Sequence, residues 1–273
     1  MTREEVISTS PISSGTGRGD SFSGAATLVR DVAIYSVVSH PVDGRTEAPY
    51  LVLVHGLGLS QRYMMPLAYE LARDCHVYIP DQPGFGGSGH PEQVIDMAGI
   101  ADALAGWADK IGLQAAIFVG NSQGCQIIAQ LAVRHPELVG AAVLQGPTAP
   151  PKERSWLWQF IRWRQNGRYN PPSLDPVTWG EYKKAGYLRV LRTFQHSLND
   201  RIEEQLPLIT VPTLIVRGEH DPICRSEWAR GLASLLPRGQ YVEIPGVAHT
   251  LCYTAPTELA TVTREFLATA IPN

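Results

Sequence analysis

The stretch that most constrains how this chain can fold is residues 116–126, where a short apolar run leads directly into a helical pattern. The apolar residues 117–119 are typical of a strand that is buried on both faces of a sheet. Apolar residues then recur at helical spacing from Ile127 to Ala132, and Pro136 ends the pattern. A strand therefore has to turn into a helix within very few residues.

Ser122 lies at that turn, in the order Gly-Asn-Ser-Gln-Gly. A residue between a strand and a helix takes a strained backbone conformation, and the turn closes only when small residues lie two places before and after it. Gly120 and Gly124 meet this requirement. The Ser122 hydroxyl is then held above the sheet edge, close to the amides of the helix N-terminus. Such a pentapeptide also occurs by chance in glycine-rich chains, but the strand and helix around it favour a nucleophilic serine.

The composition is that of a chain that folds around one large core. Its 273 residues are 44% hydrophobic, which suits a single domain, or one core with an insertion. The 23 Lys and Arg residues are balanced by 26 Asp and Glu residues, so neither a basic surface for nucleic acid nor a polybasic patch for anionic membranes is expected. We therefore expect a small-molecule substrate and no nucleic-acid or membrane partner. The sequence carries no signal for an oligomeric state.

The sequence indicates neither a cofactor nor a metal. The histidines lack the His-x-x-x-His spacing of a metal site. No apolar segment approaches the roughly 20 residues that span a bilayer, and the apolar core of a signal peptide is missing, so we expect a cytoplasmic location. The cysteines form no Cys-x-x-Cys pair and are interpreted as reduced packing residues: Cys75, Cys125, Cys224 and Cys252.

Strand and helix patterns alternate along most of the chain after a polar start. Residues 1–24 are rich in Ser, Gly and Thr without a hydrophobic period, which predicts a flexible tail. Residues 28–38 are predicted to form one strand at an antiparallel edge. Buried-strand runs separated by helix-length segments then predict an α/β fold, with a parallel sheet and right-handed crossovers. The predicted strands cover 51–54, 77–79, 117–119, 141–144, 213–216 and 241–244, and helices are predicted over 61–73, 96–111, 127–134, 226–236 and 256–270.

The alternation breaks over residues 149–206, which predicts a helical cap inserted into a core of residues 25–148 and 207–273. Aromatic and Arg residues crowd this segment, and prolines punctuate short helices within it. Trp156, Phe160 and Trp163 lie at i, i+4 and i+7, on one face of a helix. Packing within the cap is the favoured role of this face, and lining of a substrate pocket is the alternative.

Residues that can serve as an acid and a base for Ser122 follow two later strands. Asp221 comes after the strand predicted at 213–216, and His249 comes after the strand predicted at 241–244. Since an open α/β sheet builds its site at the carboxyl ends of its strands, these side chains are expected to meet there. The order Ser, Asp, His along the chain is that of the α/β-hydrolases. From about residue 50 to residue 267, the chain resembles a capped α/β-hydrolase.

The resemblance implies a serine hydrolase mechanism with a nucleophile elbow at Ser122. Ser122 would attack a carbonyl, His249 would take and return the proton, and Asp221 would hold the imidazole tautomer. The oxyanion hole would be formed by two backbone N–H groups. One belongs to Gln123, just after the nucleophile, and the other to Leu57, in a His-Gly-Leu-Gly turn.

Two other carboxylates compete with Asp221 for the acid role. Asp81 follows a strand but precedes Ser122 in the chain, and it begins a Gly-rich loop that is structural in the family. Glu219 is the closer competitor, because it precedes Asp221 by only two residues. No carboxylate follows the strand at 141–144, which removes the other place for such an acid. The remaining histidines are interpreted as turn, cap or packing residues: His55, His76, His90, His135, His196 and His220.

Three functions stay open under this resemblance. A carboxylesterase that cleaves a small ester, lactone or thioester is favoured. Hydrolysis of carbon–carbon bonds in diketone-like ring-fission products is an alternative, although Thr250 replaces the Trp that commonly follows the catalytic His in those enzymes. A non-catalytic ligand-binding module on the same fold is the third. Dehalogenase and epoxide hydrolase chemistry is disfavoured, because those relatives use Asp in place of Ser122. In the carbon–carbon hydrolase interpretation, a substrate carboxylate would meet arginines of the cap, namely Arg162, Arg164, Arg189 and Arg192.

Overall fold

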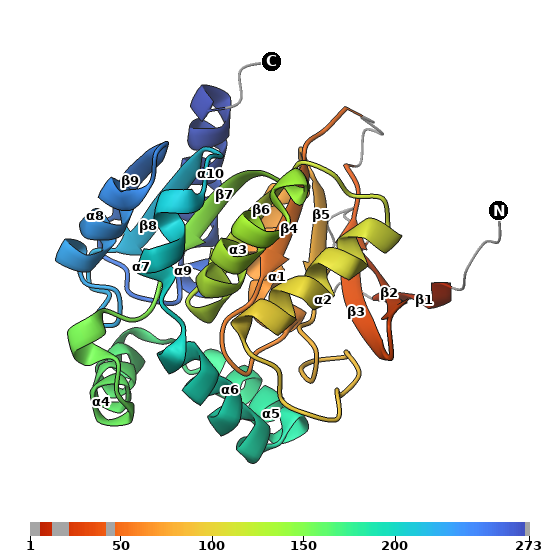
Figure 1. The fold of residues 1–273 in the computed structure, drawn as a ribbon, viewed down its shortest axis with the longest axis horizontal. Helices are drawn as coiled ribbons and strands as arrows, with labels where there is room; N and C mark the ends of the chain where they lie inside the picture. Colours follow the sequence, from red (N-terminus) through yellow and green to blue (C-terminus); the bar gives the residue numbers. More distant parts are fainter. Residues whose placement is uncertain (1–5, 13–21, 42–46, 271–273) are drawn as a thin grey trace.

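A computed structural model describes residues 6–12, 22–41 and 47–270 and has one large sheet as its centre. The nine strands described lie in the order β1-β2-β3-β5-β4-β6-β7-β8-β9 (Figure 1). β1 to β3 and β5 pair antiparallel, whereas β5, β4 and β6 to β9 pair parallel. The strands are β1 Val6–Ile12, β2 Phe22–Val29, β3 Val32–Ser39, β4 Tyr50–Val54, β5 His76–Pro80, β6 Ala116–Asn121, β7 Val139–Gln145, β8 Thr213–Gly218 and β9 Gly239–Ile244. The predicted α/β fold with a mostly parallel sheet is confirmed.

Helices cover both faces of this sheet, so the inner strands are buried on both sides. Val52 and Phe118 pack into one apolar core with residues of α2, α3 and α8. Leu51 and Val119, their neighbours along the same strands, pack into a second core with residues of α1, α9 and α10. This alternation explains why the parallel strands are continuously apolar in sequence. The helices are α1 Gln61–Leu71, α2 Met97–Lys110, α3 Gln123–Arg134, α8 Ser226–Leu235, α9 Leu251–Thr254 and α10 Pro256–Ala270.

The N-terminal part of the chain differs from the prediction in two ways. The single strand expected at 28–38 is wrong, because β2 and β3 form a hairpin that turns at Arg30 and Asp31. Arg30 has a φ of +52°, and the sequence lacks the Asn-Gly or Asp-Gly pair that usually marks such a turn. The tail expected over residues 1–24 includes strand β1 and the start of β2, while residues 1–5 and 13–21 lie outside the described part. An edge strand gains main-chain hydrogen bonds without a hydrophobic period, which is why composition missed β1.

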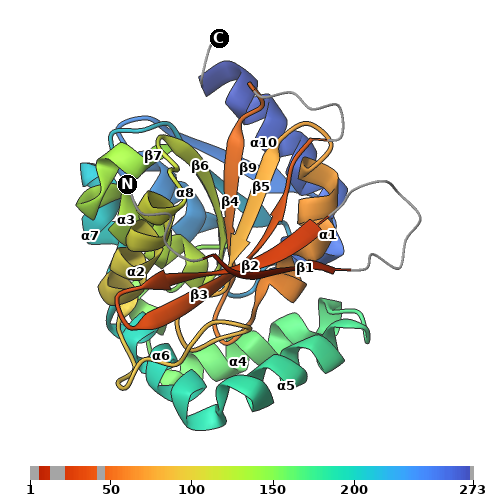
Figure 2. The same cartoon turned by 90° about the vertical axis from the view of Figure 1, so that its right-hand side faces the viewer.

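Four α-helices lie between β7 and β8, and we call them the inserted helices. α4 Trp156–Asn166, α5 Leu174–Ala185, α6 Tyr187–Asn199 and α7 Ile202–Gln205 alternate with short 3-10 turns at 151–153, 167–169 and 206–208. α4, α5 and α6 gather at one end of the sheet in both views (Figures 1 and 2). α6 is fixed to the helix that follows the serine by two hydrogen bonds. Gln126 Nε2 donates to the main-chain oxygen of Ser197, and the Ser197 hydroxyl donates to Gln126 Oε1.

Candidate active site

Ser122 lies alone between the last residue of β6 and the first residue of α3. Its backbone has φ +57° and ψ −118°, a strained conformation for any residue with a side chain. The neighbouring glycines allow it. A Cβ at Gly120 would lie 2.6 Å from Ile128 Cδ1, and one at Gly124 would overlap the main-chain oxygen of Val54. The strand-to-helix turn that the sequence predicts is therefore present.

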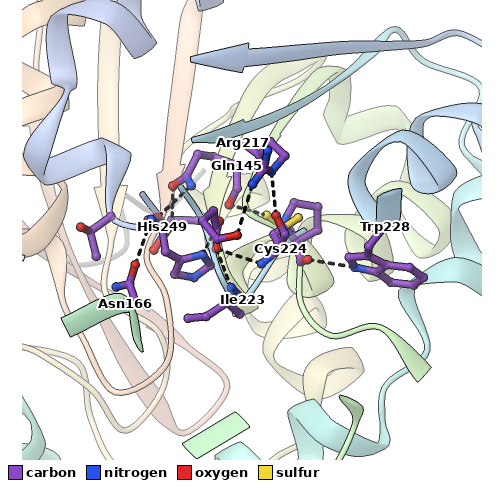
Figure 3. Close-up of polar contacts among 12 residues, drawn as sticks. Gln145, Asn166, Arg217, Ile223, Cys224, Trp228 and His249 are labelled. Atoms are coloured by element: carbon purple, nitrogen blue, oxygen red, sulfur yellow. Dashed lines mark hydrogen bonds and ion pairs between the residues drawn. The ribbon is translucent and has the colours of Figure 1, made fainter. Parts of the chain in front are cut away.

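Asp221 and His249 form a buried hydrogen-bonded pair. Asp221 follows β8, and its Oδ2 lies 2.8 Å from His249 Nδ1 (Figure 3). Its Oδ1 accepts the backbone N–H groups of Ile223 at 2.8 Å and Cys224 at 2.9 Å. These bonds fix the carboxylate, and an ionised carboxylate only accepts, so His249 Nδ1 carries the proton. His249 Nε2 is left free to accept a proton.

Ser122 and His249 line the same cavity. Within the described part of the chain, no hydrogen bond joins the Ser122 hydroxyl to the imidazole. Nucleophile and base are often loosely paired in the absence of substrate and tighten when it binds. The structure thus brings the predicted acid and base into direct contact and places the predicted nucleophile on the wall of the cavity that His249 also lines.

The two predicted oxyanion donors also line this cavity. Gln123 begins α3, and the first N–H groups of a helix have no partner within the helix. Leu57 belongs to the turn after β4, which packs tightly on the serine. A Cβ on Gly56 would lie 3.1 Å from Asn121 Oδ1 and 3.5 Å from Ser122 Cβ. This contact keeps the Leu57 turn next to the Ser122 turn.

His55 stabilises the turn that contains Leu57 through a hydrogen bond to Gly56, in keeping with its interpretation as a turn, cap or packing residue. It is fully buried, and burial lowers its pKa to about 4, so the ring is neutral. Nε2 accepts the N–H of Gln82 at 3.0 Å. The other ring nitrogen, Nδ1, therefore donates to the oxygen of Gly56 at 2.9 Å. A single tautomer of His55 thus ties the turn after β4 to the loop after β5.

The two competing carboxylates are used elsewhere. Asp81 accepts the N–H groups of Gln61 at 2.6 Å and Gly87 at 2.7 Å, so it closes the Gly-rich loop. Burial raises its pKa to about 7. Glu219 is exposed and accepts the N–H of Gly246 at 2.8 Å. Of the three acids considered, Asp221 alone contacts His249 among the hydrogen bonds of the described residues.

Three amide side chains that the sequence analysis missed surround the main chain of His249. Gln145 Nε2 donates to the His249 oxygen at 2.9 Å, and Asn121 Nδ2 donates to the same oxygen at 3.3 Å. Asn166 Oδ1 accepts the His249 N–H at 3.1 Å (Figure 3). Asn121 lies within the predicted turn, but Gln145 and Asn166 carry no local signal, because only the tertiary fold brings them to His249.

The cavity has a volume of about 450 Å³ and is almost entirely uncharged. Trp156, Phe160 and Trp163 line it and are 39–58% exposed, so this face forms part of the cavity wall. Trp156 and Trp163 also pack against rings of α6 and α5, so packing between the inserted helices, the favoured role, is present beside the alternative one. The four cap arginines considered for a substrate carboxylate are absent from the wall among the described residues, and Arg162 is paired with Glu153 at 2.6 Å. Residues after β4, β6, β8 and β9 share the wall with α4, α5 and α6, so the inserted helices cover the carboxyl ends of the strands.

The described ranges also show the state of the cysteines, the potential metal ligands and the hydropathy of the helices. All four cysteines are free and buried, which confirms them as reduced packing residues. No cluster of three or more potential metal-ligating side chains occurs among the described residues. Over the same residues, no helix combines the length and the hydropathy that a membrane crossing requires.

A mostly parallel sheet with a serine at a strained strand-to-helix turn defines the class of α/β-fold hydrolases. Comparison with known proteins agrees, because the model of the alpha/beta hydrolase family matches residues 51–262. The chain therefore belongs to the α/β-hydrolase family, and it is an enzyme of the hydrolase type.

Individual relatives match this chain over most of its length. Pyrrolizixenacetamide deacetylase of Xenorhabdus hominickii is 25% identical over 256 residues, which cover 84% of this chain and 94% of that protein. The putative carbamate hydrolase RutD of Serratia proteamaculans (strain 568) is 27% identical over 234 residues, or 76% and 86% of the two chains. A solved membrane phospholipase A, described as a bacterial virulence factor, superimposes with a TM-score of 0.79 at 25% identity, over 92% of this chain and 87% of that one.

Proposed function

We propose that the protein is a serine hydrolase that cleaves a small, uncharged carboxylic ester, lactone or thioester through an acyl-enzyme. The observation that carries this proposal is the buried Asp221–His249 pair, of which His249 lines one cavity with Ser122 at the strained turn. A base with its Nδ1 proton held by a carboxylate has its Nε2 lone pair free for a serine hydroxyl. Carboxylesterase activity is the simplest outcome of this arrangement.

The proposed reaction has two halves. In the first, His249 Nε2 takes the hydroxyl proton as Ser122 Oγ bonds to the substrate carbonyl carbon. The bond from that carbon to the leaving group then breaks, and the same proton goes to the oxygen of a leaving alcohol or to the sulfur of a leaving thiol. In the second, His249 deprotonates a water molecule that attacks the acyl-enzyme, and the proton returns to Ser122 Oγ. Asp221 stays ionised throughout and stabilises the imidazolium.

The oxyanion that forms in each half is proposed to accept hydrogen bonds from the N–H groups of Leu57 and Gln123. Their contribution comes from being fixed before the charge develops, in a site that excludes water. Gly56 and Gly124 allow the two turns to approach closely. A Cβ at Gly124 would overlap the main-chain oxygen of Val54, and one at Gly56 would be only 3.1 Å from Asn121 Oδ1.

The substrate class follows from the cavity and from the proposed cap. We propose that residues 149–206 form a cap domain whose aromatic residues enclose the acyl or alcohol group. A largely apolar wall favours uncharged groups of medium size. The relatives named a deacetylase and a carbamate hydrolase support cleavage next to a carbonyl, and they extend the candidates to amides and carbamates. The carbon–carbon hydrolase alternative loses its main support, since its arginines do not line the cavity.

The proposed function is tested with p-nitrophenyl esters of increasing acyl length, beside lactones and a ring-fission diketone. We expect hydrolysis of the short and medium esters, and Ser122→Ala should lower kcat by several orders of magnitude while the protein stays folded, because the three residues act as a unit. Asp221→Asn should lower kcat by about 10³- to 10⁴-fold through loss of the correct tautomer. Near-normal ester hydrolysis by folded Ser122→Ala would refute the mechanism, and a wild-type protein that binds but turns over none of these compounds would indicate the ligand-binding alternative.

A further inference from the structure

The segment that carries His249 is held by side chains of the inserted helices as well as by the core. Asn166, the last residue of α4, is 3% exposed, and its Oδ1 accepts the His249 N–H at 3.1 Å. Figure 3 shows the Asn166 amide directed at the main chain of His249 from the side opposite Gln145. The His249 peptide is thus gripped between the inserted helices and the core.

A second set of contacts joins the same two segments. Asn170 Oδ1 accepts the Thr250 hydroxyl at 3.0 Å and the Asn166 Nδ2 amide at 3.3 Å. Further along, the Tyr253 hydroxyl donates to the main-chain oxygen of Ser173 at 3.2 Å. The chain between α4 and α5 therefore lies along the segment from His249 into α9, with a hydrogen bond every few residues.

These contacts fix a different part of His249 from the part that Asp221 fixes. Asp221 binds the ring nitrogen Nδ1 and sets the tautomer, but it leaves the ring free to move with its backbone. The main-chain oxygen is held by Asn121 and Gln145, which belong to the core. The main-chain N–H has Asn166 as its partner, so the position of Nε2 relative to Ser122 depends on α4.

We propose that Asn166 is a positioning residue for the proposed reaction, through which the inserted helices set the distance from His249 Nε2 to Ser122 Oγ. The inference rests on the proposed function. A buried N–H that loses its partner is costly, so the segment shifts toward another partner or toward water. Nucleophile and base are sensitive to such a shift, because about 1 Å of misplacement costs roughly 100-fold in rate. Trp163 lies one turn earlier on α4 and lines the cavity, so contact between a substrate and this wall acts on the same helix end.

The test compares Asn166→Ala and Asn166→Asp with wild type. The assays are p-nitrophenyl butyrate hydrolysis and the rate at which a fluorophosphonate labels Ser122. Asn166→Ala should lower kcat and the labelling rate by the same factor, about 10- to 100-fold, with KM changed less than about twofold. Asn166→Asp keeps the oxygen acceptor, so it should recover most of kcat. Its added carboxylate favours the protonated imidazole and should move the acidic limb of the kcat/KM profile to higher pH.

Gln165→Ala is the matched control, because it removes the neighbouring amide of α4, which contacts Arg162 and does not line the cavity. It should leave both rates unchanged. Wild-type rates in Asn166→Ala, or equal losses in the Ala and Asp variants, would overturn the proposal. If Asn166→Ala does not fold, the proposal is tested with Thr250→Val and Asn166→Asp instead. Thr250→Val should lower kcat and the labelling rate together, several-fold. Wild-type rates in Thr250→Val, combined with no pH shift in Asn166→Asp, would overturn the proposal. Failure of the proposed function differs from both, since wild-type protein itself would then resist labelling.

Discussion

Gly146 lies directly against the Asp221–His249 pair and leaves no room for a side chain. A Cβ at this position would lie 2.8 Å from His249 Cε1 and 3.2 Å from Asp221 Oδ2, and the backbone has a φ of +63°. We expect Gly146→Ala to push the imidazole away from Ser122 and to lower kcat by about 100-fold. The measurement is kcat on p-nitrophenyl butyrate together with the melting temperature.

The control for this substitution is Gly231→Ala. Gly231 lies in α8, and a Cβ there meets nothing within 4 Å. This variant should keep wild-type kcat and be slightly more stable, because alanine is the better helix former. Equal kcat in the two variants would contradict the account of Gly146.

His55 makes a prediction about stability and pH. Its pKa is lowered by burial from 6.5 to about 4, so between those values the unfolded chain binds a proton that the folded protein does not. The stabilisation is therefore present above pH 6.5 and is lost as the pH falls, by about 2 kcal/mol between pH 7 and about pH 5. His55→Gln can still donate to Gly56 and accept from Gln82, and it should lack this loss.

Urea unfolding at the two pH values, on wild type and on His55→Gln, measures the difference. Burial raises the pKa of Asp81 to about 7, and this opposite pH dependence cancels because both proteins contain Asp81. If the two proteins lost the same free energy of unfolding on acidification, His55 would not be the neutral residue that its hydrogen bonds require.

At the scale of residues, the sequence identified those candidate site residues whose position in a turn or after a strand marks them. Ser122 is recognisable because its turn needs glycine two places away on each side, and Asp221 and His249 because each follows a strand of the parallel sheet. Their partners are different in kind. Gln145 and Asn166 act through side-chain amides on the main-chain oxygen and N–H of His249, and no periodicity marks such a contact. A sequence pattern therefore locates the reacting groups but not the residues that hold them.

At the scale of elements, the aromatic face of α4 is part of the cavity wall. Trp156 packs edge-on against Phe194 at 4.7 Å, and Trp163 against Trp179 at 6.2 Å, between ring centroids. All four residues line the cavity. Trp156→Ala or Trp163→Ala should change the ranking of p-nitrophenyl esters by chain length, in favour of longer acyl groups, and leave the acetate comparatively untouched.

The control on the same helix is Leu157→Ala, since Leu157 is exposed and lies outside the cavity wall. It should keep the wild-type ranking. If a tryptophan variant slowed every ester by the same factor without loss of stability, the aromatic face would not contact the substrate. A loss of melting temperature with an unchanged ranking would assign the tryptophans to packing between α4, α5 and α6.

Hydrophobic patterns predicted the bounds of the long helices well, but they did not resolve the short strands β2 and β3. α10 begins and ends where the sequence places it, at Pro256 and Ala270, because proline favours the first turn of a helix. The hairpin of β2 and β3 was merged into one strand, since Arg30 takes a left-handed backbone without the usual residue type. Helical spacing also shows that three aromatics of α4 share a side, but not that this side both packs on neighbouring helices and lines an open cavity.

At the scale of the whole molecule, the parallel pairing of β4 to β9 is what the alternation of buried strands and helices predicts, whereas the order of the strands in the sheet comes from the structure. The two cores use alternate residues of the same strands, such as Leu51 and Val52. That arrangement requires helices on both faces and leaves the carboxyl ends of the strands as the open edge where a site forms. β1 escaped prediction, because it adds to an edge through main-chain pairing with β2, which leaves no hydrophobic period in the sequence.

The place of the inserted helices in the chain has a consequence for the timing of activity. With the proposed roles, the nucleophile precedes them at Ser122, whereas the acid and the base follow at Asp221 and His249. Protein synthesis proceeds from the N-terminus, so the ribosome releases the serine, then the inserted helices, and only afterwards the residues proposed to activate the serine. A nascent or prematurely terminated chain thus contains a serine without a base, and hydrolytic activity begins only when β8 and β9 have joined the sheet.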